Sequence, residues 1–292
     1  MEGDPAIRWQ VMRDLTDEPP QRVAAERALV ATTGWGARLL GLQTDDGLWG
    51  GGDYSPKWTS TTYTLLLLRH LGIDPANADM RRAAGLVNAN VFSGRANQPF
   101  FSYRGETCIS GMTLALGSYF LVAPDKSAQV AEWILGEQLE DGGWNCQTVN
   151  GSRVASFHTT ISALEGLAEY RAGAGGDAAI SAAIGRGQEY LLERRLFRRR
   201  STGEVVNPRW MLFSFPPRWH YDVLRGLDHL RQAQAAADSR CDEALAVVEG
   251  KRGKDGRWPL QNPHRGLEHF GLEEGAGRPS RWNTLRAMRV LR

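Results

Sequence analysis

Four side chains in the middle of the chain are of types that bind transition metals: Glu106, Cys108, Cys146 and His158. A carboxylate, thiolates and an imidazole together form an ordinary ligand set for zinc, and a site with three protein ligands keeps a fourth position for substrate. Zinc also lowers the pKa of a bound thiol, so it would hold Cys108 as the thiolate. The residue types therefore favour a zinc site, provided that the fold brings these residues together.

Six segments of the chain begin alike, and their alignment predicts that fold. The aligned segments start at Arg8, Thr62, Cys108, Thr160, His220 and Arg281. Their second residue is always large, their third is always polar, and their fifth is always Met or Leu. Similarity in a fixed register at intervals of roughly 45 to 60 residues is typical of a repeat architecture.

Each of these segments after the first follows another segment with an Ala-rich apolar face, as expected of an amphipathic helix. We predict these outer helices over 21–42, 79–91, 126–139, 177–193 and 238–251. The inner helices are predicted near 5–15, 58–72, 106–121, 158–170, 218–233 and 280–291. No segment with strand periodicity is long enough to build a sheet. The prediction is therefore a single all-α domain over 1–292, a toroid with an inner and an outer ring of helices.

In such a toroid every inner helix begins at the same end, so aligned positions surround one mouth of the barrel. Glu106 and His158 share a column of the alignment, Cys108 lies two columns further in, and Cys146 precedes the His158 helix. We therefore expect these four residues to be the metal ligands. A second ligand set replaces Glu106 with His220, which is predicted roughly 120° around the mouth.

His220 is also a candidate acid or base, because imidazole titrates near neutral pH. Asp222, two residues further along the chain, is a second candidate catalytic residue. The large residues of the alignment and their neighbours could line a cavity for an apolar, unsaturated substrate, because aromatic faces stabilise carbocations. These residues are Trp9, Trp58, Tyr63, Tyr103, Trp219, Tyr221 and Trp282. The alternative is that they fill the barrel, since protein interiors are close-packed.

Three outer helices are followed by similar turns that end in Trp. Asp-Gly closes the helix in each, because Gly accepts the left-handed conformation at a C-cap, and the Trp can fold back over the helix end. The turns at 43–49 and 138–144 resemble the QW motifs of squalene–hopene and oxidosqualene cyclases, whereas the third has Arg252 in place of Gln. This resemblance, which covers essentially the whole chain, implies the same helical toroid. The toroid is also similar to the β-subunits of protein prenyltransferases and to small bacterial single-toroid proteins with such repeats.

The resemblance to prenyltransferase β-subunits implies a function for the mouth. Their zinc is held by an Asp-x-Cys pair and a His, to which Glu106-x-Cys108 and His158 look equivalent, with Glu one methylene longer than Asp. In that family zinc holds an acceptor thiol for attack on a prenyl diphosphate. The resemblance thus implies an isoprenoid substrate, a partner subunit or dimer, and cations for the diphosphate. Candidate cations are Lys57, Arg104, Arg153 and Arg218.

Two other functions remain open. A class II terpene cyclase protonates an alkene with a DxDD motif, which this chain lacks, although Asp222 leaves related chemistry open. A non-catalytic toroid with a structural zinc would bind a lipid or a protein. Lanthionine-synthetase-like cyclases also resemble the chain in using Cys, Cys and His, but their Cys-His-Gly run is missing.

The composition narrows these classes. The chain has 292 residues, 42% of them hydrophobic and 23% charged, with a net charge of +2, which gives no reason to expect a nucleic-acid partner. No apolar run approaches the roughly 20 residues of a membrane span, and the N-terminal residues do not resemble a secretory signal. Three cysteines cannot all pair and do not form a disulfide framework, so we expect a cytoplasmic protein.

Overall fold

The computed structural model describes residues 3–174, 178–233 and 238–292, which are mainly helical. The helices are α1 (Pro5–Asp14), α2 (Pro20–Ala28), α3 (Gly34–Leu40), α4 (Thr61–Leu71), α5 (Ala78–Asn90), α6 (Thr107–Tyr119), α7 (Pro124–Gly136), α8 (Phe157–Ala174), α9 (Ala178–Leu192), α10 (Val223–Gln232), α11 (Asp242–Glu249) and α12 (Arg281–Val290). Two short antiparallel ladders pair β1 (Phe92–Ser93) with β2 (Gln98–Pro99) and β3 (Trp258–Pro259) with β4 (Pro279–Ser280). The predicted all-α class is confirmed.

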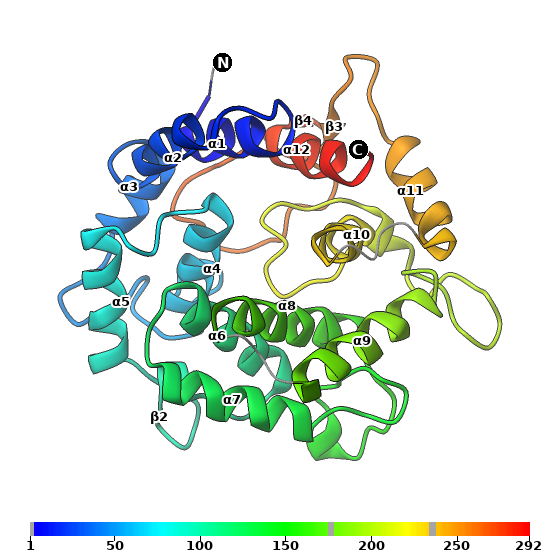
Figure 1. The fold of residues 1–292 in the computed structure, drawn as a ribbon, viewed down its shortest axis with the longest axis horizontal. Helices are drawn as coiled ribbons and strands as arrows, with labels where there is room; N and C mark the ends of the chain where they lie inside the picture. Colours follow the sequence, from blue (N-terminus) through cyan, green and yellow to red (C-terminus); the bar gives the residue numbers. More distant parts are fainter. Residues whose placement is uncertain (1–2, 175–177, 234–237) are drawn as a thin grey trace.

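The helices alternate between an inner and an outer set, as predicted. The inner helices are α1, α4, α6, α8, α10 and α12, and most begin within three residues of their predicted starts. In Figure 1, α5, α7, α9 and α11 lie at the periphery, whereas α4, α6, α8 and α10 lie nearer the centre. The predicted outer helix over 177–193 is α9, and Asp177 itself lies outside the described residues.

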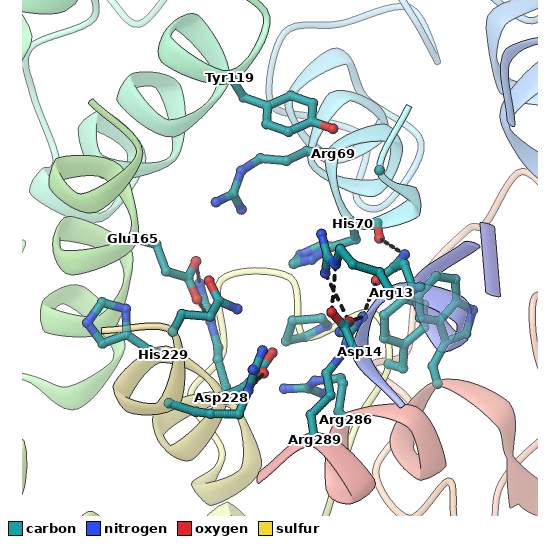
Figure 2. Close-up of a pocket in the computed structure, with 18 of the residues that line it drawn as sticks. Arg13, Asp14, Arg69, His70, Tyr119, Glu165, Asp228, His229, Arg286 and Arg289 are labelled. Atoms are coloured by element: carbon teal, nitrogen blue, oxygen red, sulfur yellow. Dashed lines mark hydrogen bonds and ion pairs between the residues drawn. The ribbon is translucent and has the colours of Figure 1, made fainter. Parts of the chain in front are cut away.

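Contacts between successive inner helices close the ring. Gln10 of α1 donates to the carbonyl oxygen of His70 in α4 at 3.0 Å, and Arg225 of α10 forms an ion pair with Glu165 of α8 at 2.7 Å. Direct packing joins α4 to α6, α6 to α8 and α10 to α12. Arg289 of α12 donates to Gln10 at 2.7 Å, so the last helix packs on the first. Figure 2 shows Glu165 and Arg289 among the side chains that line one pocket between these helices.

The three Trp-containing turns share one hydrogen-bond network. In each, the indole N–H donates to a carbonyl near the end of the preceding outer helix: Trp49 to Leu39 at 2.7 Å, Trp144 to Ile134 at 2.8 Å and Trp258 to Val248 at 2.6 Å. The backbone N–H of each Trp donates to a threonine hydroxyl of the following inner helix, on Thr61, Thr160 and Thr284 respectively. Each turn therefore fastens an outer helix to the next inner helix.

The glutamines of the first two turns add a link to the next outer helix. Gln43 donates to the carbonyl of Ala83 in α5 at 3.0 Å, and Gln138 donates to that of Ala183 in α9 at 2.9 Å. In the third turn Arg252 instead lies over the ring of Trp258, 5.7 Å from its centroid. The third turn therefore keeps the hydrogen bonds of the other two turns, and only the contact of its Gln-equivalent residue, Arg252, differs.

Glycines allow α6 and α8 to approach closely. A Cβ added at Gly111 would lie 2.5 Å from the carbonyl oxygen of Ser162, and one at Gly166 would lie 2.4 Å from that of Gly111. Backbone atoms cannot move away as a flexible side chain can, so only glycine fits at these positions. This contact sets the distance between the helix that carries Cys108 and the helix that begins at Phe157.

Two parts of the prediction differ from the structure. The first outer helix is divided in two: α2 ends at Ala28, a 3₁₀ turn (Leu29–Ala31) follows, and α3 begins at Gly34, whose φ is +70°. The fifth inner helix begins only at Val223, five residues later than predicted, because Asp222 is its N-cap. The preceding segment and the segment between β3 and β4, yellow and orange in Figure 1, instead run across the ring interior.

Apolar side chains from both rings form the core. One buried cluster centres on α7 to α11 and includes Trp144 and Leu164, and the other spans α1 to α6 and includes Trp49 and Leu68. Within the described ranges, no helix combines the length and the hydropathy that a membrane span requires.

Candidate functional site

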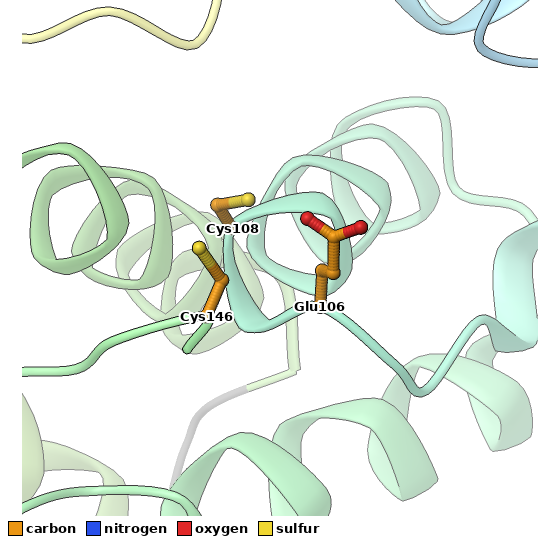
Figure 3. A group of neighbouring side chains, drawn as sticks. All are labelled: Glu106, Cys108 and Cys146. Carbon is orange, nitrogen blue, oxygen red and sulfur yellow. The ribbon is translucent and has the colours of Figure 1, made fainter. Parts of the chain in front are cut away.

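Three of the four predicted metal ligands come together at the start of α6. Glu106 is the residue before the first turn of α6, Cys108 lies in that turn, and Cys146 lies in the loop between α7 and α8. A carboxylate oxygen of Glu106 and the two Sγ atoms all lie within 4.8 Å of one another. Figure 3 shows the three side chains pointing to the same side of the helix start. We call Glu106, Cys108 and Cys146 the thiol–carboxylate group.

The start of α8 positions Cys146. The backbone N–H of Cys146 donates to the hydroxyl of Thr159 at 3.3 Å, and that of Trp144, two residues earlier, donates to Thr160 at 3.0 Å. The backbone N–H of Ser156 also donates to the carbonyl of Trp144 at 2.8 Å. The Trp-containing turn thus fixes the path of this loop and places Cys146 beside Cys108.

The two thiols of this group differ in pKa. A hydrogen bond from Cys108 lowers the pKa of Cys146 to about 6, with a further contribution from Thr159. The same hydrogen bond, together with burial, raises the pKa of Cys108. Cys146 is therefore the thiol of this pair that ionises more readily. Thiolates are the form in which cysteine binds metals and attacks electrophiles.

The donor set of this group fits zinc. Two sulfurs and one carboxylate oxygen are all zinc ligands, and three protein ligands are typical of a site with an open position. Cys108 is buried, Cys146 is half-buried and Glu106 is exposed, so the group is closed on its sulfur side and accessible from its carboxylate side.

His158 lies apart from this group. Its Nδ1 accepts a hydrogen bond from the backbone N–H of Tyr221 at 2.8 Å, and burial lowers its pKa to about 4. A neutral imidazole that accepts at Nδ1 carries its proton on Nε2, which leaves no lone pair there for a metal. Of the four predicted ligands, the structure brings Glu106, Cys108 and Cys146 together, whereas His158 supports the segment before α10.

His220 lies beside His158 in a stack of rings. Its ring stacks on Trp219 at 3.8 Å and on His264 at 3.9 Å, and it meets the ring of His158 at 5.9 Å. Burial, followed by the charges of His264 and His158, lowers the pKa of His220 to about 3. His220 is therefore neutral at pH 7, so it cannot act as an acid, and its lowered pKa makes it a weak base. His264, which the sequence analysis did not identify, has a buried Nε2 without a partner among the described residues.

Asp222 has a structural role at the start of α10. One of its oxygens accepts from the backbone N–H of Arg225 at 2.8 Å, and the other accepts from the hydroxyl and the backbone N–H of Ser214, at 2.9 and 3.3 Å. Only 2% of Asp222 is exposed. Since three protein donors occupy the carboxylate, the structure gives it the role of a helix cap.

Most of the predicted substrate-binding aromatics are packed in the interior. Tyr63 meets Trp58 edge to face at 4.7 Å. Tyr221 is buried and donates to the carbonyl of Leu196 at 2.6 Å. The hydroxyl of Tyr103 accepts a hydrogen bond from the backbone N–H of Glu106 at 3.4 Å, which places this ring beside the thiol–carboxylate group.

Two of the four predicted cations, Arg218 and Arg104, differ in environment. Arg218 is buried, pairs with Glu268 at 2.7 Å and lies over the ring of Trp58 at 5.3 Å. Arg104 is exposed, and its backbone exchanges two hydrogen bonds with the side chain of Gln98. The charge of Arg218 is therefore already offset by Glu268, whereas Arg104 is exposed and lies two residues before Glu106 in the sequence.

A cavity of about 610 Å³ lies toward the other end of the inner helices. Trp9 and Trp282 line it, but most of its wall is polar, unlike the apolar substrate cavity expected from the sequence. Its charged lining residues are Arg13, Asp14, Arg27, Arg69, Glu165, Glu169, Arg225, Asp228, Arg231, Arg286 and Arg289. Figure 2 shows Arg69, Glu165 and Asp228 pointing into it from three different helices.

The aligned positions lie at the starts of the inner helices, so the repeat pattern gave no indication of this cavity. Cys108 and Tyr119 are eleven residues apart on α6, which corresponds to roughly 16 Å along a helix. The thiol–carboxylate group and the cavity therefore lie near opposite ends of α6. A signal was present, since Arg225, Arg286 and Arg289 are charged residues within helices that were predicted to face the interior.

Comparison with known proteins gives only distant similarity. No family model matches the chain, and no curated protein matches it. The solved structures that match include type II terpene cyclase MstE from Scytonema in its apo form, at 17% identity and a TM-score of 0.45, covering 99% of this chain and 87% of that chain. A variant of MstE in complex with geranylgeranyl dihydroxybenzoate matches at 16% identity and a TM-score of 0.45, over 98% of this chain and 85% of that one. Because both the sequence identities and the TM-scores are low, the similarity to these structures does not support a specific function.

Proposed function

We propose that this protein is a zinc-dependent enzyme whose metal is held by Glu106, Cys108 and Cys146 at the mouth of the helical ring. The observation that carries the proposal is the convergence of two thiols and a carboxylate from two separate elements within 4.8 Å. Zinc bound there would supply a Lewis acid that lowers the pKa of a thiol or a water molecule.

The residues around the group support a catalytic role over a structural one. Structural zinc sites are usually closed by four protein ligands, whereas this group offers three and is accessible beside Glu106. The hydrogen bond with Cys108 lowers the pKa of Cys146, which favours the thiolate form that binds metals. Burial raises the pKa of Tyr54 to about 12, with a smaller contribution from the neighbouring Glu106, so this phenol stays protonated and can donate a hydrogen bond at the same mouth.

An isoprenoid or other apolar substrate remains part of the proposal. Tyr54, Tyr63 and Trp58 provide neighbouring aromatic faces at this end of the ring. Such faces suit an unsaturated chain or a developing cation. The alternative cyclase-like reaction through Asp222 is less well supported, because the carboxylate of Asp222 is occupied by three donors.

Metal content tests the proposal directly. Protein purified without chelator should contain one zinc per chain by plasma mass spectrometry. Cys108→Ala and Cys146→Ala should each lose most of it, because two protein ligands bind zinc much more weakly than three. Cys241→Ala is the matched control, since Cys241 is buried at the start of α11 and lies outside the group. His158→Ala should also keep the metal.

Two results would contradict the proposal. Zinc-free protein that stays zinc-free after incubation with the metal would show that the group is not a metal site. Zinc-loaded protein that transfers no group from prenyl diphosphates to thiols or water, while Cys108→Ala loses stability, would point to the non-catalytic toroid with a structural metal.

A further inference from the structure

The polar cavity has an excess of positive charge. Its wall contains seven arginines and four carboxylates, an excess of three positive charges. Burial lowers the pKa of His70 to about 3 and that of His229 to about 4, so both lining histidines are neutral at pH 7. All six inner helices contribute to this wall, so the charge faces an interior space rather than open solvent.

Carboxylates of the wall neutralise only some of these arginines. Glu169 pairs with Arg69, and Glu165 forms a two-pronged contact with Arg225. Asp14 pairs with both Arg13 and Arg289, and Asp228 lies 3.5 Å from Arg231. These pairs use all four carboxylates of the wall.

Arg27 and Arg286 have no carboxylate within hydrogen-bond distance among the described residues. Arg27 donates to the carbonyl of Gly72 at 2.8 Å and to the hydroxyl of Tyr119 at 3.0 Å. Arg286 donates to the carbonyl of Ser214 at 3.0 Å, and it forms a longer ion pair, 3.9 Å, with Asp222, whose carboxylate also accepts from three other donors. Arg27 therefore has no carboxylate partner in this part of the structure, and the charge of Arg286 is only partly offset.

One face of α12 presents donors without partners. Trp282, Arg286 and Arg289 follow one another at the spacing of a single helix face, and all three line the cavity. The indole N–H of Trp282 and the Nε–H of Arg289 are buried and have no acceptor among the described residues. Buried donors are normally satisfied, so orphan donors in a cavity wall indicate an acceptor that binds there.

Helix dipoles account for only part of this charge. Cations in the last turn offset the partial negative charge at a helix C-terminus, and Arg13, Arg69, Arg231 and Arg289 occupy such positions. Arg286 lies in the middle of α12, where this explanation does not apply.

We propose that the cavity binds a small phosphate-bearing anion, recognised by Arg286, Arg289 and Trp282 on α12 together with Arg27. A phosphate monoester carries about two negative charges at neutral pH, which suits an excess of two to three positive charges. The planar guanidinium matches phosphate oxygens in pairs. A volume of about 610 Å³ leaves room for an organic group beyond the phosphate. This site is separate from the thiol–carboxylate group and does not depend on the proposed function.

Calorimetry with the full-length protein tests the proposal, using inorganic phosphate, pyrophosphate and glycerol 3-phosphate as probes at constant ionic strength. Saturable binding of at least one probe is expected. Arg27→Met and Arg286→Lys should each weaken it about tenfold. Arg286→Lys keeps the charge, so it tests the guanidinium geometry with little risk to folding. Arg82→Met is the matched control, because Arg82 is exposed on α5 and lies outside the cavity.

Three outcomes would overturn the proposal. No saturable binding of any probe at millimolar concentration would mean that the arginines only balance the helix ends. Equal weakening by Arg82→Met would indicate attraction by surface charge. Equal affinity for succinate would exclude recognition of phosphate as such. Retention of binding by Cys108→Ala, in contrast, is expected and separates this site from the thiol–carboxylate group.

Discussion

At the scale of single residues, carboxylates at two inner-helix starts have different surroundings. Glu106 precedes α6, makes no side-chain capping hydrogen bond and is exposed beside two sulfurs. Asp222 precedes α10, is buried and accepts from Ser214 and from the backbone of Arg225. Glu106 is therefore available to a ligand, whereas Asp222 is committed to the fold.

Replacing Asp222 with Ala should destabilise the protein by about 1–2 kcal/mol, because a helix loses its N-cap and buried donors lose an acceptor. Asp222→Asn keeps one capping oxygen and should cost less. Urea unfolding followed by circular dichroism measures both. An Asp222→Ala protein of unchanged stability that has lost only activity would instead support the catalytic role expected from the sequence.

Residue types and alignment predicted that Glu106, Cys108 and Cys146 lie together, but not that His158 lies apart from them. The alignment places Glu106, Cys108 and His158 near helix starts, which is a matter of helix geometry alone. The orientation of the His158 ring depends on the backbone of Tyr221, 63 residues further along the chain. That contact is decided by the path of a loop, which the repeat pattern does not specify.

At the scale of elements, the predictable features are those that short segments encode. The Trp-containing turns could be predicted because Gly in the left-handed conformation and an indole near a helix end interact within a dozen residues. The helix pair α6 and α8 is different, since its close approach depends on Gly111 and Gly166, which carry no obvious signal in one sequence.

Gly111→Ala and Gly166→Ala should each destabilise the protein by about 1–3 kcal/mol, the usual cost of overpacking. The added Cβ would meet backbone oxygens at 2.5 and 2.4 Å, so the two helices would have to move apart. Zinc binding should weaken in parallel for Gly111→Ala, because Cys108 lies one turn earlier on the same helix.

Gly85→Ala provides the control for this pair. Gly85 lies on the outer helix α5, and an added Cβ would meet nothing within 4 Å. The substitution should stabilise the helix by about 0.5–1 kcal/mol, since alanine loses less backbone entropy than glycine. Thermal unfolding of the three variants separates the effects, and equal shifts for all three would refute a specific α6–α8 contact.

At the scale of the whole molecule, the repeat pattern predicted the ring but not what fills it. Contacts such as that between Arg289 and Gln10 close the ring, as expected for a toroid. The segments before α10 and between β3 and β4 have no counterpart in the other repeats, and they run through the interior. There Phe215 stacks on Trp282 at 4.3 Å. The residues expected to line a hollow barrel are therefore partly packed against these segments.

Burial of imidazoles throughout the molecule has a consequence for stability. The pKa of each of the six histidines is lowered, foremost by burial; it falls to about 3 for His70 and about 4 for His229. The folded protein keeps these rings neutral, whereas the unfolded chain binds protons below about pH 6.5. Because the unfolded state binds more protons, stability should fall as the pH drops from about 6.5 toward 4.

For His70 and His229 the loss should be about 1.4 kcal/mol each at pH 5.5, one unit below the unfolded pKa. Urea unfolding at pH 7.5 and 5.5 measures it, with EDTA present so that metal release does not contribute. His70→Gln and His229→Gln should each reduce the difference between the two pH values. Although burial acts to raise the pKa of Glu165, Arg225 holds it at about 2. The stability that the ionised Glu165 contributes is therefore lost only below about pH 4.5, outside this pH range. Equal stability at both pH values would mean that the folded protein accommodates protonated imidazoles in its interior, which would also undermine the charge balance inferred for the cavity.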